Sequence, residues 1–164
     1  MTRARAMALA LVTLAASTAH AGLVSIVHDA ASPQASYAAR KLGEALRERG
    51  YEVVPVHPEG GERDGRPCFP RVSAIAPAVE GALLLVPPGQ AEGVVRDCLD
   101  AGVRRIWLHR GSGSGSASPE ALALCASRGV TPVVDLCPMM ALAGTSWPHR
   151  LHGWFRMRAG RAPR

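Results

Sequence analysis

Short apolar runs alternate with amphipathic segments along most of this 164-residue chain. The apolar runs are rich in Val, Leu and Ile, and each has the length of one buried strand. In the segments between them, apolar residues recur every three or four positions, which is the spacing of a helix that packs on one side. The pattern predicts strands over residues 23–27, 51–56, 81–86, 105–109 and 130–136, and helices over 36–49, 90–101 and 118–128.

Glycines mark the ends of these helices. Gly50, Gly102 and Gly129 each stand between a predicted helix and a predicted strand. The residue after a helix often adopts a left-handed conformation, which glycine adopts without a penalty from Cβ. Ser118 and Pro119 give the opposite signal, a capping side chain followed by a proline, so a helix begins there. Strands and helices in alternation predict an α/β fold with a doubly wound, five-stranded parallel sheet.

The segments around these elements complete the predicted organisation. The run 81–86 is apolar throughout, so its strand should be central in the sheet. Ser36 is expected to cap the first helix. Residues 59–70 are rich in Gly and Pro and predict a loop, followed by a short helical turn near residues 71–75. Since ligands of such sheets bind outside the carboxyl ends of the strands, ligand-binding residues are expected there.

The composition suits one domain with an aliphatic core. Apolar residues make up 48% of the chain and aromatic residues 4%, so the core must consist of Val, Leu, Ile and Ala. The net charge is +6, and Lys41 is the only lysine among 19 cationic residues. This charge suits an anionic partner. Because no aromatic residues interleave with the arginines and no nucleic-acid motif accompanies them, nucleic-acid binding is not predicted.

The two ends of the chain differ from its middle. Arg3 and Arg5, the apolar run 6–16 and a small-residue site ending at Ala21 have the order of a secretory signal peptide. An alanine-rich helix packed on the sheet has the same pattern, and the run is too short for a transmembrane anchor. Arginines are frequent in the last fifteen residues. We expect a signal-like or helical segment over 1–22, one domain over 23–140 and a basic extension over 141–164 with a helix over 148–159.

The four cysteines do not form a recognisable metal motif. Cys68, Cys98, Cys125 and Cys137 lie far apart, without the paired spacing of a structural zinc site. Cys98 and Cys125 fall on the apolar faces of their helices and are predicted core residues. Cys137 follows the fifth strand and could act as a nucleophile. The sequence shows no base beside it, so a structural or ligand-lining role is favoured.

Three strand ends carry residues that suit a ligand. The loop 28–32 after the first strand has none of the glycines of an ordinary NAD site, although the helix that follows it could hold a phosphate at its N-terminus. His57 and Pro58, after the second strand, could contact an adenine or a ribose, or form a simple polar turn. Pro87 and Pro88, after the third strand, form either a ligand shelf or a turn.

The remaining motifs do not predict catalysis. The loop 109–116 is rich in Gly and Ser and could cradle an anion, but a flexible linker is the favoured interpretation. The G-x-S-x-G motif of nucleophile-elbow hydrolases is absent from the sequence. No combination of acid, base and nucleophile is visible along the chain.

Read in order, the strand-end segments resemble the small CoA-binding domain proteins, a Rossmann-like family related to the CoA-binding domain of succinyl-CoA synthetase. The resemblance covers residues 23–140. Residues 49–58 are similar to the family's G-Y-x-V-x-P-V-N-P segment, with His57 in place of Asn. Four further segments are similar to family motifs: 67–75 to Y-P-S-L-x-x-I, 86–88 to V-P-P, 101–108 to A-x-x-x-G-x-x-x-x-W-L and 137–140 to C-P-M-M.

The resemblance implies a Rossmann-like fold and non-catalytic binding of coenzyme A or acyl-CoA at the carboxyl ends of the strands. Because coenzyme A is a cytosolic ligand, it favours a cytoplasmic location over export through a signal peptide ending near Ala21. The chain departs from the family where His28 and Asp29 replace the glycine of a V-G-A-S motif, and a carboxylate there would repel a diphosphate. The implied contacts are Ala31, Ser32 and Ser36 for the diphosphate, His57 and Pro58 for the adenosine, and Pro87, Pro88 and Cys137 for the pantetheine arm.

Three other functions stay open. One is an enzyme that handles acyl or thiol groups with Cys137 as its nucleophile. Another is an interaction protein with a vestigial pocket, whose arginine-rich tail binds an acidic partner or a membrane surface. The last is a redox-sensing nucleotide binder. The absence of the dinucleotide-binding glycines from the loop 28–32 argues against it.

Overall fold

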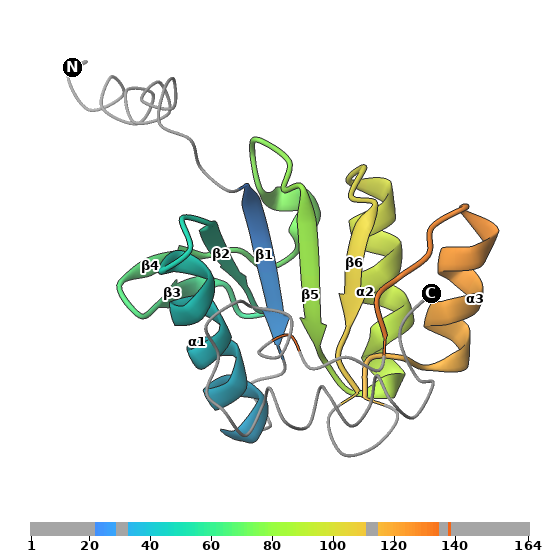
Figure 1. The fold of residues 1–164 in the computed structure, drawn as a ribbon, viewed down its shortest axis with the longest axis horizontal. Helices are drawn as coiled ribbons and strands as arrows, with labels where there is room; N and C mark the ends of the chain where they lie inside the picture. Colours follow the sequence, from blue (N-terminus) through green and yellow to red (C-terminus); the bar gives the residue numbers. More distant parts are fainter. Residues whose placement is uncertain (1–21, 29–32, 111–114, 135–137, 139–164) are drawn as a thin grey trace, which may run out of the picture.

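Four parallel strands form the central sheet of the fold (Figure 1). The structure is a computed structural model that describes residues 22–28, 33–110, 115–134 and 138. The apolar run after residue 80 forms an inner strand, as predicted, because both of its edges are paired. Across the sheet the strands lie in the order β2 (Glu52–Val56), β1 (Leu23–His28), β5 (Gly81–Leu85) and β6 (Arg105–Leu108).

Helices cover both faces of this sheet (Figure 1). On one face, α1 (Pro33–Arg47) places Leu42 and Leu46 in a cluster with Ile26 of β1 and Leu83 of β5. On the other face lie α2 (Pro88–Asp100) and α3 (Pro119–Ser127). The predicted doubly wound α/β fold is therefore confirmed.

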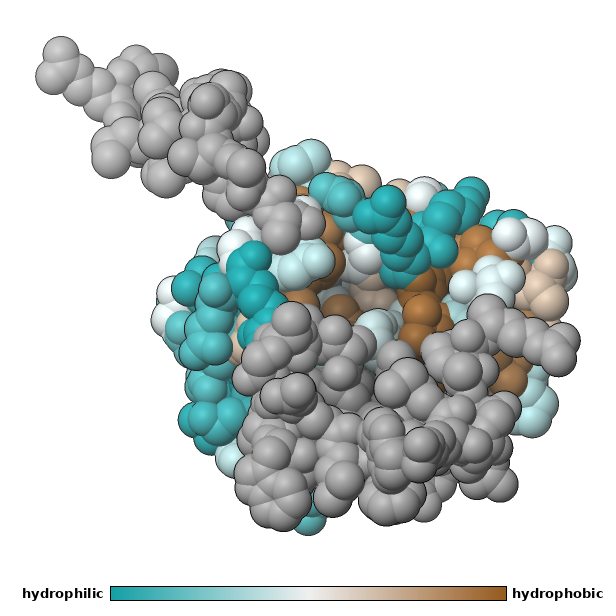
Figure 2. Space-filling model, in the orientation of Figure 1, coloured by the Kyte–Doolittle hydropathy of each residue, from teal (hydrophilic) through white to brown (hydrophobic). Residues whose placement is uncertain are grey.

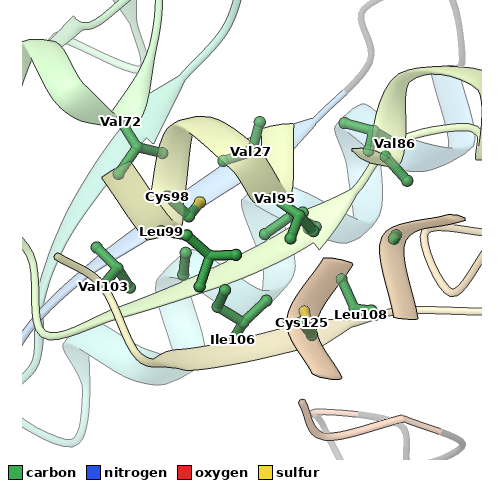
Figure 3. Packing of buried hydrophobic residues seen from close by; sticks show 14 of the residues in the cluster. Val27, Val72, Val86, Val95, Cys98, Leu99, Val103, Ile106, Leu108 and Cys125 are labelled. Carbon is green, nitrogen blue, oxygen red and sulfur yellow. The ribbon is translucent and has the colours of Figure 1, made fainter. Parts of the chain in front are cut away.

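The larger apolar cluster fills the space between the sheet and helices α2 and α3 (Figure 3). Leu84 and Leu108 of the sheet share this cluster with Val95 and Cys98 of α2 and Cys125 of α3, and all five side chains are fully buried. The two cysteines are core residues, as predicted. The cluster contains no aromatic side chain that is fully buried, which agrees with the aliphatic core expected from the composition.

Two of the three α-helices in the described residues begin earlier than predicted. α1 begins at Pro33, so Ser36 lies inside its first turns and the prediction of a Ser36 cap is wrong. α2 begins at Pro88, with Pro87 in the N-cap position. Proline is preorganised for the first helical position and needs no hydrogen-bond acceptor there, so it starts both helices. The start of α3 is confirmed, because the Ser118 Oγ accepts a hydrogen bond from the Ala121 N–H at 3.2 Å.

The predicted helix ends are confirmed at all three glycines. The φ angles of Gly50, Gly102 and Gly129 are 85°, 85° and 67°, in the left-handed region where a side chain is strained. After each of them the chain turns directly towards its next segment at the sheet.

The predicted fifth strand is reduced to a single bridge in the residues that the structure describes. Val133 donates a hydrogen bond to the Ile106 carbonyl and accepts one from the Leu108 N–H, both at 2.9 Å. Three residues earlier, the Val130 N–H still caps α3 by donating to the Cys125 carbonyl, so the chain joins the sheet only at Val133. The five-stranded sheet is therefore not confirmed, and residues 135–136 lie outside the described part.

The prediction of a loop over residues 59–70 is wrong, because this segment contains a β-hairpin. Strand β3 (Gly61–Arg63) pairs antiparallel with β4 (Arg66–Cys68). The turn is formed by Asp64 and Gly65, with φ angles of 51° and 71°, which is the Asp-Gly signal of a two-residue hairpin turn. The helical turn expected next is confirmed as η1 (Val72–Ala74).

Several predictions fall on residues outside the described part. They concern the signal-like segment before Gly22, the site residues Ala31, Ser32 and Cys137, and the basic helix over 148–159. Within the described residues, no helix has the length and apolar character needed to cross a membrane. No group of three or more His, Cys, Asp or Glu side chains in that part could hold a metal ion.

Candidate functional site

Two cavities flank the carboxyl end of β1, and His28 lines both of them. The α1 pocket, of about 450 Å³, lies between α1, β2 and the β3–β4 hairpin. The α2 pocket, of about 300 Å³, lies between α2, η1 and the ends of β1 and β2. Together they form the strand-end crevice in which doubly wound sheets bind their ligands.

The α1 pocket is polar and basic. Arg40 and Arg47 of α1 and Arg63 of the hairpin line it, and Asp64 is the only acidic residue among its lining residues. Arg40 and Arg47 are seven positions apart, so they lie on one face of the helix, two turns from each other. Ser36, predicted as a diphosphate contact, also lines this pocket, near the start of α1.

His57 lies buried at the end of β2, with 4% of its surface exposed. Its Nδ1 accepts a hydrogen bond from the Glu59 N–H at 3.2 Å and lies 3.0 Å from Nη2 of Arg63. With two donors at Nδ1, the neutral ring carries its proton on Nε2. The ring packs against His28, with 5.5 Å between the ring centroids. The Glu59 N–H and Arg63 of the hairpin therefore hold His57 in position and favour the Nε2–H tautomer.

A buried thiol lies next to this histidine. Burial raises the pKa of Cys68, and the Arg63 side chain and the His57 backbone N–H oppose that shift more weakly. The thiol is therefore protonated at neutral pH and acts as a small apolar residue with weak polar contacts.

The α2 pocket contains one of the predicted contact residues. Pro58, at the end of β2, lines it together with Val86, Gln90 and Gly93. Pro87 is half-buried and Pro88 is exposed at the start of α2, and neither belongs to the lining of the two pockets. The two prolines, expected as a ligand shelf, thus lie at the turn from β5 into α2, beside the α2 pocket.

A buried serine holds this corner in place. The Ser116 Oγ accepts a hydrogen bond from the Val86 N–H at 2.9 Å and lies 2.8 Å from the Leu84 carbonyl and 2.9 Å from the Val86 carbonyl. At the preceding Gly115, with a φ of 49°, an added Cβ would collide with the carbonyl oxygens of His109 and Arg110. The interpretation of this loop as a flexible linker is therefore wrong at Ser116, whose hydroxyl is held by backbone groups about 30 residues away.

Most of the residues that form the two pockets were not predicted from the sequence. No sequence motif marks Arg40, Arg47, Arg63 or Gly93 as a ligand contact. The seven-residue spacing of the first two arginines is a signal in the sequence, but Arg63 joins them through the hairpin alone. Of the predicted contacts, Ser36 lines the α1 pocket, Pro58 lines the α2 pocket, and His57 lies beside Arg63.

A third cavity lies away from the strand ends. It measures about 500 Å³ and follows the α1 face of β5 and β6, where Leu83 and Trp107 line it. Figure 2 shows brown, hydrophobic surface over these strands beside the teal surface of α1. The cavity reaches Gly22 and Glu80 near the amino ends of the strands, so it belongs to the opposite end of the sheet from the site predicted by the fold.

Comparison with protein families gives one match. The profile of a family described as CoA binding domain matches residues 30–143. This range contains most of the residues that line the two strand-end pockets, but not those that β1 contributes, which end at His28. No curated protein matches the chain.

Solved structures share the fold. The crystal structure of Prb, the PH1109 protein redesigned for binding, has a TM-score of 0.63 and 26% identity, over 76% of this chain and 85% of its own. A hypothetical protein from Pyrococcus horikoshii OT3 has a TM-score of 0.62 and 27% identity, over 74% and 83%. The dinucleotide forming acetyl-coenzyme A synthetase 1 of Ca. Korarchaeum cryptofilum, in complex with phosphate and ADP, has a TM-score of 0.56 and 26% identity, over 69% of this chain and 25% of its own. The predicted Rossmann-like fold is confirmed.

Proposed function

The chain belongs to the CoA binding domain family, and from this premise we propose that it binds coenzyme A or an acyl-CoA, without catalysing a reaction, at the carboxyl ends of β1, β2 and β5. The observation that carries the proposal is the pair of cavities on either side of His28. A ligand with two ends joined by a diphosphate can occupy both pockets while its centre crosses the end of β1. Coenzyme A has this form, with a nucleotide at one end and a pantetheine arm at the other.

We place the nucleotide end at the carboxyl end of β2 and assign the adenosine to His57 and Pro58, which directly follow that strand. Pro58 borders the α2 pocket, and His57 contacts Arg63 of the α1 pocket. The diphosphate would lie near the start of α1, close to Ser36, Ala31 and Ser32. The positive end of a 15-residue helix favours negative charge at that point, and the net charge of +6 adds to it.

The pantetheine arm belongs in the α2 pocket. Val86, Gly93 and Val94 offer it an apolar wall, and Gln90 offers an amide for hydrogen bonds. The arm would enter past Pro87 and Pro88, and Cys137 is the further contact expected from the family motif.

The chemistry of the described thiols supports a binding role. Burial raises the pKa of Cys68, Cys98 and Cys125, and that of Cys98 to about 12. Thiols protonated at neutral pH are poor nucleophiles. None of the three therefore suits acyl transfer, and thioester chemistry at this site would have to use Cys137.

Ligand-dependent stability tests the proposal directly. The thermal midpoint of the full chain should rise with increasing coenzyme A and stay constant with NADH, because a ligand that binds only the folded state stabilises it by mass action. At a hundredfold excess over Kd the stabilisation is about 2.7 kcal/mol. Equal responses to coenzyme A and NADH, or no response to either, would contradict the proposal.

A substitution in the α2 pocket tests the position of the ligand. At Gly93 an added Cβ meets nothing within 4 Å, so Gly93→Leu should fold and fill the pocket with its side chain. Coenzyme A should then lose at least about tenfold in affinity, or roughly 1.4 kcal/mol. Ala123→Leu, at an exposed position of α3, is the matched control. Unchanged affinity in Gly93→Leu would exclude the α2 pocket.

A further inference from the structure

Two arginines that line the α1 pocket each have one buried N–H group without a hydrogen-bond acceptor. The Nε atoms of Arg47 and Arg63 are buried, and neither has a hydrogen-bond partner among the described residues. Buried N–H groups are almost always paired, because an unpaired one loses its hydration without compensation. Both guanidinium groups are thus incompletely paired in the lining of one cavity, which favours an anion close to them.

Each of the two side chains has defined neighbours beside the pocket. The guanidinium of Arg47 folds back over Gly43, where an added Cβ would lie 3.3 Å from Nη1 and 3.4 Å from Nη2. Arg63 is fixed through Nη2, which donates to Glu59 Oε2 at 3.1 Å and lies 3.0 Å from His57 Nδ1.

The electrostatics of the pocket favour an anion. Three arginines and one aspartate line it, so their formal charges sum to +2. Burial and, second, the positive charge of Arg66 lower the pKa of Arg47, so a nearby negative charge would stabilise its charged form. A phosphomonoester offers close to two negative charges and three acceptor oxygens, and guanidinium groups bind it through paired, charge-assisted hydrogen bonds.

We propose that the α1 pocket binds a phosphomonoester through Arg47 and Arg63. On the coenzyme A proposed above, and resting on that proposal, the group is the 3′-phosphate of the ribose. Arg63 touches both the cavity and His57, so the ribose would lie between the adenine at His57 and the phosphate in the pocket. The site thereby selects coenzyme A over ligands that lack the ribose phosphate.

Calorimetric titration with coenzyme A and dephospho-coenzyme A tests this selection. The unchanged chain should bind coenzyme A at least about tenfold more tightly than dephospho-coenzyme A. Arg47→Gln should reduce that ratio towards one by weakening coenzyme A alone. Arg63→Gln should reduce it as well, with some loss for both ligands because Arg63 also holds His57. Arg96→Gln removes an exposed arginine of α2 with the same charge change and should leave the ratio unchanged.

The outcomes separate this inference from the proposed function. Equal affinities for the two ligands in the unchanged chain, or equal losses for both in Arg47→Gln, would overturn the phosphomonoester site while coenzyme A binding stands. If neither ligand binds, adenosine 3′,5′-bisphosphate and AMP replace them as probes. Preference for the bisphosphate would then support the site although the proposed function had failed, and equal or absent binding would overturn both. Thermal midpoints of each variant identify any loss caused by misfolding.

Discussion

Replacing Ser116 with alanine should destabilise the corner between β5 and α2. The Ser116 side chain is fully buried and connects the end of the β6 loop to the backbone of Leu84 and Val86, about 30 residues away. Alanine fills nearly the same volume but can neither accept nor donate a hydrogen bond. The Val86 N–H would then be buried without an acceptor.

The expected cost follows from which groups lose their partner. The Leu84 carbonyl still accepts a hydrogen bond from the His109 N–H at 3.0 Å, so it loses only one of its two hydrogen bonds. The Val86 N–H loses its recorded acceptor, and an unpaired buried donor costs about 1–3 kcal/mol. For a chain of this length, each kcal/mol lowers the thermal midpoint by roughly 2–4 °C, so Ser116→Ala should lower it by roughly 2–12 °C.

Urea unfolding measures this cost. The midpoint concentration should fall while the slope stays constant, because the surface exposed on unfolding does not change. Ser127→Ala is the control, since the Ser127 hydroxyl is exposed and donates only to the Leu124 carbonyl, and it should stay within about 0.5 kcal/mol of the unchanged chain. A cost for Ser116→Ala as small as that of the control would refute the reasoning. Because Val86 lines the α2 pocket, coenzyme A affinity should also fall in Ser116→Ala alone.

Three further predictions concern charge and protonation. Asp29→Asn should tighten coenzyme A binding several-fold in a calorimetric titration, because it removes the carboxylate that the sequence predicts to repel the diphosphate; weaker binding would contradict the predicted repulsion. Burial lowers the pKa of His109 below 6.5, so the unfolded chain takes up a proton that the folded chain does not, and the free energy of unfolding should fall as the pH drops through 6.5. His109→Gln should flatten that profile in urea unfolding, and an unchanged profile would exclude His109 as its source. With its pKa near 12, Cys98 should react with a thiol reagent at pH 7 only after unfolding, as mass spectrometry of the labelled peptides would show; rapid native labelling would contradict its burial.

The sequence by itself determined the order and type of the main elements. Their signals are local: a helix repeats its apolar residues every three or four positions, Gly50 and Gly102 supply left-handed helix ends, and Ser118 caps α3 through a residue three positions away. The order of motifs along the chain also predicted the family, which the match over residues 30–143 confirms. The hairpin after β2 was predictable as well, because Asp64 and Gly65 form the turn signal that the loop prediction overlooked.

Tertiary structure alone decided the site. The α1 pocket exists because the hairpin brings Arg63 to the face of α1 that carries Arg40 and Arg47, and no local rule relates residues of α1 to a side chain beyond β2. Ser116 is a similar case, since its hydroxyl pairs with backbone groups of Leu84 and Val86, at the end of β5. Such contacts depend on how the sheet and its connections pack in three dimensions. Periodicity and turn signals act over a few residues, so they predict the elements but not which side chains the packed elements bring together.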